Sequence, residues 1–218
     1  MMHIDKNSYG SLALVYLCCA AVAVLVFLFV PAVWVHWLVL GIVLWFAAWQ
    51  TRFFSVPNRN VTIDNNFVLS VADGRVIIVD QVYEGEFLKR DCKRVAVYMN
   101  FFDLHANFWP VAGTVTYFKY HPGKHILAFN PKTSEDNEHT CTCIRTAAGQ
   151  EIFFKQIAGG FARRIVNYAK PGLTVEAGSQ CGIIKFGSRI DMYLPVEAEV
   201  VVCVGDLVRS CESALARL

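Results

Sequence analysis

Between Ser11 and Trp49 the sequence contains no aspartate, glutamate, lysine or arginine. The absence of charge over such a length excludes a solvated surface for this segment. The hydrophobic residues make up 55% of the chain and are concentrated there, whereas the part from about Arg52 onward has the composition of a soluble protein. The 218 residues therefore predict one globular domain preceded by a smaller apolar part.

A strong excess of one charge is also missing. The formal net charge is +2, which argues against nucleic acid as a partner, since such proteins usually carry a strongly basic domain. The eight cysteines lack the paired CxxC spacing of zinc sites, and their scatter fits a reducing compartment. Cys141 and Cys143 would point to one face of a strand, where we favour two small core residues over a metal or redox pair. No metal cofactor is expected.

The apolar part is long enough to cross a membrane. Residues 11–30 form a run of 20 residues, about 30 Å as a helix. Pro31 and an aromatic group around Trp34 and Trp37 follow, and residues 38–49 are apolar again. We predict a helical hairpin in a membrane anchor over 1–54, with a short aromatic turn and a short or tilted second span. A cleaved signal peptide and a single long or re-entrant span are the alternatives.

The few charges beside the anchor predict its orientation. Lys6 precedes the hairpin, Arg52 and Arg59 follow it, and the turn has neither lysine nor arginine. The tendency of positive charge to stay inside places both ends in the cytoplasm. We therefore expect a cell-membrane protein with a domain over 55–218 at the cytoplasmic face.

The sequence of the domain predicts a series of strands separated by turns. Strand-type runs cover 67–83, 94–102, 113–120, 125–129, 140–146 and 150–157, with turn residues such as Ala72-Asp73-Gly74 between them. The later segments 172–186 and 198–218 each place a glycine-containing turn between short strand-type runs, a pattern typical of small barrel-sandwich domains. Residues 157–170 have apolar side chains at helical spacing and predict a helix that ends at Pro171-Gly172. The expected fold is mostly β, barrel-sandwich-like, with one or two helices. Carrier function is not supported, because the Met-Lys pair of lipoyl and biotinyl carriers is absent.

A glycine-serine pair interrupts the strand-type run 183–195. A glycine inside a strand usually marks a bulge or a close backbone approach. A strained Gly187-Ser188 peptide would also place the serine hydroxyl against the preceding carbonyl, and a nearby base would then promote an acyl shift. Elimination and hydrolysis would leave a pyruvoyl group at Ser188, an electrophilic ketone that captures an amine and accepts electrons during loss of CO2.

Six segments in order carry a resemblance to a known family. They are RFFSVPNR, LSVADGRV, YMNFFDLHANFWPVAGTV, PKTSEDNEH, KQIAGGFARRIV and KPGLTVEAGSQCGIIKFGSRIDMYLP. With the apolar N-terminal hairpin, the chain resembles the phosphatidylserine decarboxylase proenzymes of the short, membrane-anchored bacterial and archaeal type. The resemblance implies self-cleavage between Gly187 and Ser188 into chains 1–187 and 188–218 that stay together as a heterodimer. It also implies a covalent pyruvoyl group made from Ser188, a zymogen, and conversion of phosphatidylserine to phosphatidylethanolamine.

The resemblance also assigns the other site residues. Asp73 matches the acidic residue that supports the base of self-processing, and His105 matches the histidine associated with decarboxylation. The larger branch of the family has a second histidine where this chain has Phe108. Either His105 does both tasks, or Asp73 acts through another group.

The remaining polar residues carry less specific signals. His121 is interpreted as a surface-turn residue and His139 as part of a solvated loop. Glu135 and Glu138 in that loop are read as a polar hairpin tip rather than active-site groups. Four basic residues could meet a lipid phosphate or form a solvated face: Arg163, Arg164, Lys185 and Arg189.

The sequence thus predicts a lipid decarboxylase, with a bilayer and its own cleaved chain as partners and homo-oligomerisation left open. A membrane-anchored β module that binds a lipid or protein without cleaving itself is the alternative from another class. The same reaction on an archaeal-type ether lipid is the closer alternative, since the head group is shared.

Overall fold

The structure, a computed structural model, describes residues 2–59, 61, 64, 66–124, 136–160, 164–185 and 188–218. The chain divides into two compact units, Met1–Asn58 and Arg59–Leu218.

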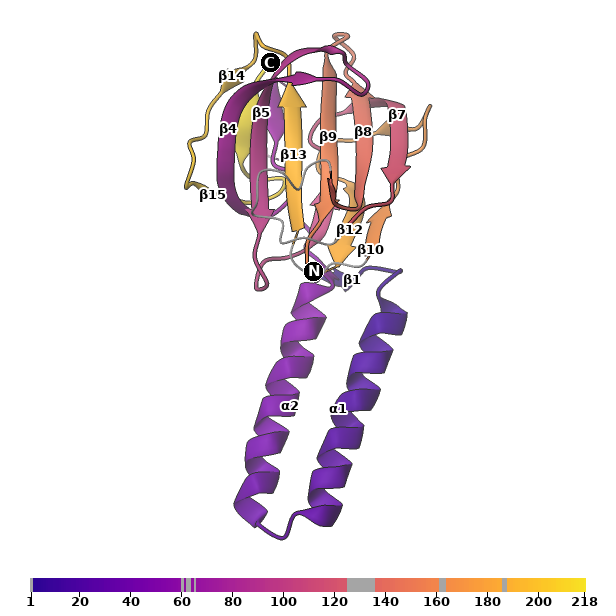
Figure 1. Cartoon of the computed structure of the whole chain (residues 1–218), viewed down its shortest axis with the longest axis vertical. Coiled ribbons are helices and arrows are strands. Elements are labelled where there is room, and N and C mark those ends of the chain that lie inside the picture. The colour runs from indigo at the N-terminus through magenta and orange to yellow at the C-terminus, as the bar shows by residue number, and fades with distance from the viewer. Residues whose placement is uncertain are drawn as a thin grey trace. The chain divides into compact units, whose positions relative to one another are not determined.

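The first unit consists of two long apolar helices (Figure 1). Helix α1 spans Tyr9–Phe29 and α2 spans Val33–Phe53, 21 residues each and long enough to cross a bilayer core. The short strands β1 (His3–Ile4) and β2 (Ser55–Val56) pair antiparallel at their ends. The two predicted helices are therefore present within residues 2–58.

The predicted aromatic turn is wrong. The helix begins two residues after Pro31, so Trp34, His36 and Trp37 lie in the first turns of α2. The connection between the helices is confined to the residues around Pro31, whose ring fixes φ and which lacks an N–H group to donate. As a result, the second helix is as long as the first.

The second unit is built on a curled antiparallel sheet of eight strands (Figure 1). Their order is β11-β7-β8-β9-β13-β5-β4-β15, so β13 runs between β5 and β9. The bounds in chain order are β4 Gly74–Glu84, β5 Arg90–Met99, β7 Gly113–His121, β8 His139–Arg145, β9 Glu151–Ala158, β11 Thr174–Val175, β13 Ser188–Leu194 and β15 Leu207–Val208.

Two three-stranded sheets complete this unit. One has the order β10-β12-β6 and the other β14-β16-β3. Their bounds are β3 Phe67–Leu69, β6 Ala106–Phe108, β10 Arg164–Asn167, β12 Gln180–Lys185, β14 Glu199–Val200 and β16 Ala214–Arg217. The predicted mostly-β fold is confirmed, and the strand-type runs outside 125–129 form strands. Residues 125–129 lie outside the described part of the chain.

The large sheet buries side chains on both of its faces. Successive residues of a strand point to opposite faces, so neighbouring residues of one strand join different clusters. On β13, Ile190 and Met192 join the main core, which includes Met99 and Ala158. Tyr193 points the other way, into a smaller cluster. The main-core side is called the inner face below, and the other side the outer face.

The predicted helix over 157–170 is wrong. Residues up to Ala158 continue β9, which pairs with β8 on one side and β13 on the other. Arg164–Asn167 form β10, which pairs with β12, and residues 161–163 lie outside the described part. The Gly159-Gly160 pair is poor in helix propensity, and strand pairing on both sides overrides the helical spacing of the apolar residues.

Candidate active site

Ser188 is the first residue of β13 and lies at the end of the inner face. In the sheet register it pairs with Met99 of β5 and with Ala158 of β9. Its side chain is fully buried, and its Oγ donates a weak hydrogen bond to Met99 Sδ at 3.7 Å. Gly187, the other half of the predicted cleavage site, lies outside the described residues. The sheet therefore fixes Ser188 from both sides at the strand start.

His105 lies immediately before β6 and is fully buried. Its backbone carbonyl accepts a hydrogen bond from the Ile184 N–H at 3.2 Å, close to the end of β12 and four residues before Ser188 in the sequence. Its Nδ1 lies 2.9 Å from the Asp103 carbonyl oxygen. Because a carbonyl only accepts, the proton of the neutral ring is on Nδ1 and the lone pair is on Nε2.

The protonation state of His105 follows from its burial. Burial lowers its pKa to about 4, against a smaller opposing effect of the Asp103 carbonyl and of the Asp73 charge. The imidazole is therefore neutral at pH 7 and can accept a proton through Nε2.

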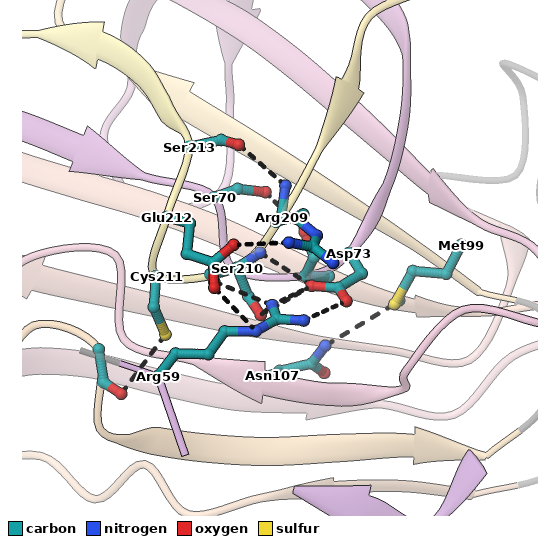
Figure 2. A network of polar contacts seen from close by, with 12 residues as sticks. Arg59, Ser70, Asp73, Met99, Asn107, Arg209, Ser210, Cys211, Glu212 and Ser213 are labelled. Atoms are coloured by element: carbon teal, nitrogen blue, oxygen red, sulfur yellow. Dashed lines mark hydrogen bonds and ion pairs between the residues drawn. The ribbon is translucent and has the colours of Figure 1, made fainter. Parts of the chain in front are cut away.

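Asp73 is held in the turn before β4 by an ion pair and two further hydrogen bonds (Figure 2). The Arg59 guanidinium donates to both carboxylate oxygens, with Nη2 to Oδ2 at 2.7 Å. The Ser210 backbone N–H and hydroxyl both donate to Oδ1 at 2.9 Å. Burial alone would raise the pKa of Asp73, but these bonds outweigh it and lower that pKa. Asp73 is therefore a fixed anion rather than a group that exchanges protons near neutral pH.

Phe108 is the residue at which the resemblance implies a second histidine in the larger branch of the family. It lies in β6, buried, and pairs with Gln180 of β12. Its backbone N–H donates to the Val71 carbonyl at 2.9 Å. The phenyl ring has no basic atom, so this position supplies packing and strand pairing only.

A buried array of side-chain amides beside Ser188 was not predicted. Asn107 and Ser188 both contact Met99 Sδ, the amide at 3.9 Å. Gln156 donates through Nε2 to Asn107 Oδ1 at 2.7 Å. Gln156 Oε1 in turn accepts from Asn167 Nδ2 at 2.6 Å and is hydrogen-bonded at 2.8 Å to the hydroxyl of Thr140. These bonds fix the Asn107 NH₂ group toward the Met99 sulfur, which the Ser188 hydroxyl also contacts.

One glycine makes room for this array. A Cβ on Gly182 of β12 would lie 2.2 Å from the Val166 carbonyl oxygen and 3.1 Å from Gln156 Nε2. Only glycine allows this close approach of β10 and β12. The sequence signals for the array were Gln156 on the face of β9 that otherwise carries Ile152, Phe154 and Ala158, and Asn107 two residues after His105.

Several other predicted residues have different surroundings. Arg189 is not part of a solvated basic face, because it forms a fully buried ion pair with Asp191, with Nε to Oδ1 at 2.7 Å. Lys185 is buried and Arg164 is exposed, while Arg163 and Glu135 lie outside the described residues. Glu138 is buried, so the polar-tip interpretation does not hold for it.

The two further histidines also differ from their predicted settings. His139 is buried and begins β8, so it is not a solvated loop residue. His121 ends β7, paired in register with His139, and its side chain is one quarter exposed. Cys141 and Cys143 are both buried on the outer face, as expected of small core residues.

The low pKa of His105 makes stability depend on pH. The unfolded chain binds a proton at His105 below about pH 6.5, whereas the folded chain does so only below about pH 4. The contribution of His105 to the free energy of unfolding is therefore fully present above about pH 6.5, and it is lost as the pH falls toward 4. We expect this loss to be on the order of 3 kcal/mol.

The measurement is chemical unfolding of full chains at pH 7 and pH 4.5. Ser188→Ala and the double variant Ser188→Ala/His105→Gln are compared, so that both proteins are single chains. The double variant should lose markedly less stability on acidification. Equal losses in the two proteins would contradict the assignment of the effect to His105.

Comparisons with known proteins place this chain in a family. Residues 46–216 match the family model for phosphatidylserine decarboxylase. A phosphatidylserine decarboxylase proenzyme of Amoebophilus asiaticus is 41% identical over 170 residues, 78% of this chain and 76% of the relative. A proenzyme of the same name from Porphyromonas gingivalis is 35% identical over 219 residues, 100% of this chain and 99% of the relative. The Ralstonia nicotianae proenzyme is 40% identical over 185 residues, 85% and 82% of the two chains. The chain belongs to the phosphatidylserine decarboxylase family, whose members are carboxy-lyases.

Proposed function

We propose that this protein converts phosphatidylserine to phosphatidylethanolamine and CO2 with a pyruvoyl group made from its own Ser188. The observation that carries the proposal is the position of Ser188. It is buried at the start of β13 and contacts the same Met99 sulfur as the amide of Asn107. His105, two residues before Asn107, is bonded through its backbone carbonyl to Ile184, four residues before Ser188. The family match over 46–216 supports the substrate, since the relatives are named for it.

Formation of the group begins with the serine hydroxyl. Ser188 Oγ attacks the Gly187 carbonyl carbon, the amide C–N bond breaks, and an ester remains. Removal of the Ser188 Cα proton then expels the Gly187 carboxylate and leaves dehydroalanine. Water adds to this residue and ammonia leaves, so that residue 188 ends as a pyruvoyl group. Both the first and the second step need a base.

We assign the base to His105. Its ring is neutral with the lone pair on Nε2, and burial keeps it so down to about pH 4. Phe108 supplies no alternative, and the Asp73 carboxylate is already occupied by Arg59 and Ser210. Asp73 instead supplies a fixed negative charge that stabilises His105 after it takes up a proton. His105 therefore performs both tasks that the resemblance left open.

The pyruvoyl group supplies an electrophilic ketone that binds the substrate amine and draws electrons from the carbon that loses CO2. The chain around it excludes water through Met99, Ala158 and the strand pairing of β13. The Asn107 NH₂ group is oriented to donate a hydrogen bond in this space. Once protonated, His105 can return its proton to the carbon from which CO2 has left.

We also propose that the first unit anchors the enzyme in the membrane. Helices α1 and α2 are each long and apolar enough to cross it. Lys6 and Arg52 flank the hairpin, which favours the cytoplasmic side for both ends and for the domain over 55–218. A diacyl lipid presents its head group at the interface, so a tethered domain would meet its substrate without a search in bulk solution.

The test is the intact mass of the purified full chain under denaturing conditions. We expect two polypeptides that meet after Gly187, with residues 188–218 blocked at the N-terminus and lighter by the loss of the amine. The same preparation should release CO2 from phosphatidylserine vesicles. Parallel vesicles with an ether-linked lipid of the same head group separate the two lipid alternatives.

A single folded chain of 24.5 kDa that releases no CO2 would contradict the proposal. The β module that binds without cleaving itself would then be the remaining function. Such a protein should bind vesicles and should be unaffected by borohydride, which reduces a pyruvoyl ketone.

A further inference from the structure

A second cluster of reactive side chains lies on the outer face of the large sheet. Glu86 comes from the turn between β4 and β5, His121 from the end of β7, and His139 and Cys141 from β8. Each offers one ligand atom, and these atoms all lie within 4.8 Å of one another. We propose that Glu86, His121, His139 and Cys141 form a binding site for a zinc-type divalent metal ion.

The cluster is separate from the proposed active site. Cys141 belongs to the outer-face cluster, with Cys143 and Phe153. Met99 and Ala158, the register partners of Ser188, belong to the main core on the inner face. A metal ion at the cluster would therefore have no part in the decarboxylation as proposed above.

Glu86 is the centre of the cluster. Its Oε1 lies 2.6 Å from His121 Nε2 and accepts a hydrogen bond from the Tyr117 hydroxyl at 2.8 Å. Its Oε2 accepts from Cys141 Sγ at 3.1 Å. Two of the four ligand atoms thus already converge on this carboxylate. A cation that takes the place of their protons would bind the same atoms.

His139 is oriented as metal-binding histidines usually are. Its Nδ1 lies 2.7 Å from the Asn137 carbonyl oxygen, which can only accept a hydrogen bond. The proton is therefore on Nδ1, and Nε2 carries the lone pair that a metal would use. Such a second hydrogen bond fixes the tautomer and the ring orientation in known metal sites. His139 is buried, so the orientation is not averaged by solvent.

One ring must turn when the ion binds. The imidazoles of His121 and His139 are stacked, with centroids 4.4 Å apart and planes 12° apart. A metal lies in the plane of each ring that binds it, so two nearly parallel rings cannot both face one ion. His121 is the ring that can turn, since its side chain is one quarter exposed and it ends its strand.

The ligand types indicate which ion fits. Sulfur, imidazole nitrogen and a single carboxylate match zinc, whereas calcium and magnesium require oxygen ligands. Binding releases the thiol proton of Cys141, and each histidine binds as a neutral ring through its unprotonated nitrogen, so the ion meets a thiolate and a carboxylate. These two negative charges balance the ion. Lys119 and Lys155 lie 3.8 Å and 4.0 Å from the Glu86 oxygens and remain outside the ligand set.

The position of the site suggests what the ion would do. Glu86 belongs to the turn of the β4–β5 hairpin, and the neighbouring Phe87 stacks on Tyr117 of β7 at 4.4 Å. The ion would join this turn to β7 and β8, three segments far apart in the sequence. It would therefore stabilise the folded domain, because the unfolded chain does not bring its ligands together.

The test uses the full chain in detergent after removal of metals with a chelator. It is titrated with Co²⁺, whose absorption reports thiolate ligands and tetrahedral geometry, and then with Zn²⁺ as competitor. Cys141→Ser removes the sulfur ligand with little change of volume, and His121→Gln changes the exposed ligand. Cys143→Ser is the matched control, a buried thiol on the same strand and face that is outside the cluster.

We expect one equivalent of Co²⁺ to give a thiolate charge-transfer band that Zn²⁺ abolishes, and Zn²⁺ to raise the unfolding temperature. Cys141→Ser should lose the band, and both ligand variants should weaken binding at least tenfold. Cys143→Ser should behave as the parent. Absence of stoichiometric binding, or a band that persists in Cys141→Ser, would overturn the proposal. If Cys141→Ser does not fold, unchanged affinity in His121→Gln would do so.

Discussion

Replacing Ser188 with alanine should leave one chain of 24.5 kDa that releases no CO2 from phosphatidylserine. The Ser188 hydroxyl is the nucleophile that breaks the chain, and its oxygen then departs with the Gly187 carboxylate to leave dehydroalanine, so an alanine at this position can take part in neither step. We expect activity at the background level rather than a partial loss. Intact mass and CO2 release from the same preparation provide the two measurements.

The variant should remain folded, which makes the result interpretable. In the precursor the Ser188 hydroxyl contacts only a methionine sulfur at 3.7 Å among the described interactions, so its removal should cost less than about 1 kcal/mol. The control is Ser179→Ala, which removes an exposed hydroxyl bonded to the Glu176 carbonyl. That variant should be processed and active. Two chains, or CO2 release, from the Ser188→Ala variant would contradict the pyruvoyl mechanism.

Replacing His105 with glutamine should also prevent processing. Glutamine is of similar size and can still donate to the Asp103 carbonyl, but it cannot accept a proton at neutral pH. General base catalysis contributes about 10²- to 10⁴-fold, so the rate of chain cleavage should fall by at least a hundredfold. The measurement is the fraction of cleaved chain against time after synthesis.

This variant separates the two tasks assigned to His105. If the His105→Gln chain is cleaved at the parent rate and yet inactive, the histidine acts in decarboxylation alone, and processing relies on another base. Cleavage and activity that are both retained would remove His105 from the mechanism. His3→Gln, which changes an exposed histidine of the first unit, should leave both processes unchanged.

The features that were predictable from the sequence are those encoded locally. Alternation of apolar residues identified β5, β7, β8 and β9, and an uncharged run identified the two helices. The residues of the candidate site were found by resemblance rather than by geometry. Nothing in the local pattern indicates that Arg59 would hold Asp73, or that Ser210, 137 residues further on, would donate to the same oxygen.

The failures share one physical cause. The run 157–170 has helical spacing, and His139 follows a polar loop sequence, yet their described residues pair as strands. Ile157 and Ala158 pair with β13, Arg164–Asn167 with β12, and His139 with the end of β7. The amide array has the same origin, since Asn107, Gln156 and Asn167 come from three strands in two sheets. Pairing between distant segments is decided by the whole fold, and a local pattern carries little information about it.

The central position of β13 has a consequence for the life of the enzyme. All seven of its residues pair with β5 and the first six also pair with β9. Further along the same segment, β15 joins β4 and β16 joins β3. After cleavage as proposed, this 31-residue piece is held in the domain without a covalent bond. It entered the sheet while it was still joined to the rest of the chain, and that connection is absent from the mature enzyme. Refolding would then require an encounter of two molecules and depend on their concentration. The mature enzyme would be assembled once, and heat would inactivate it irreversibly where the precursor recovers.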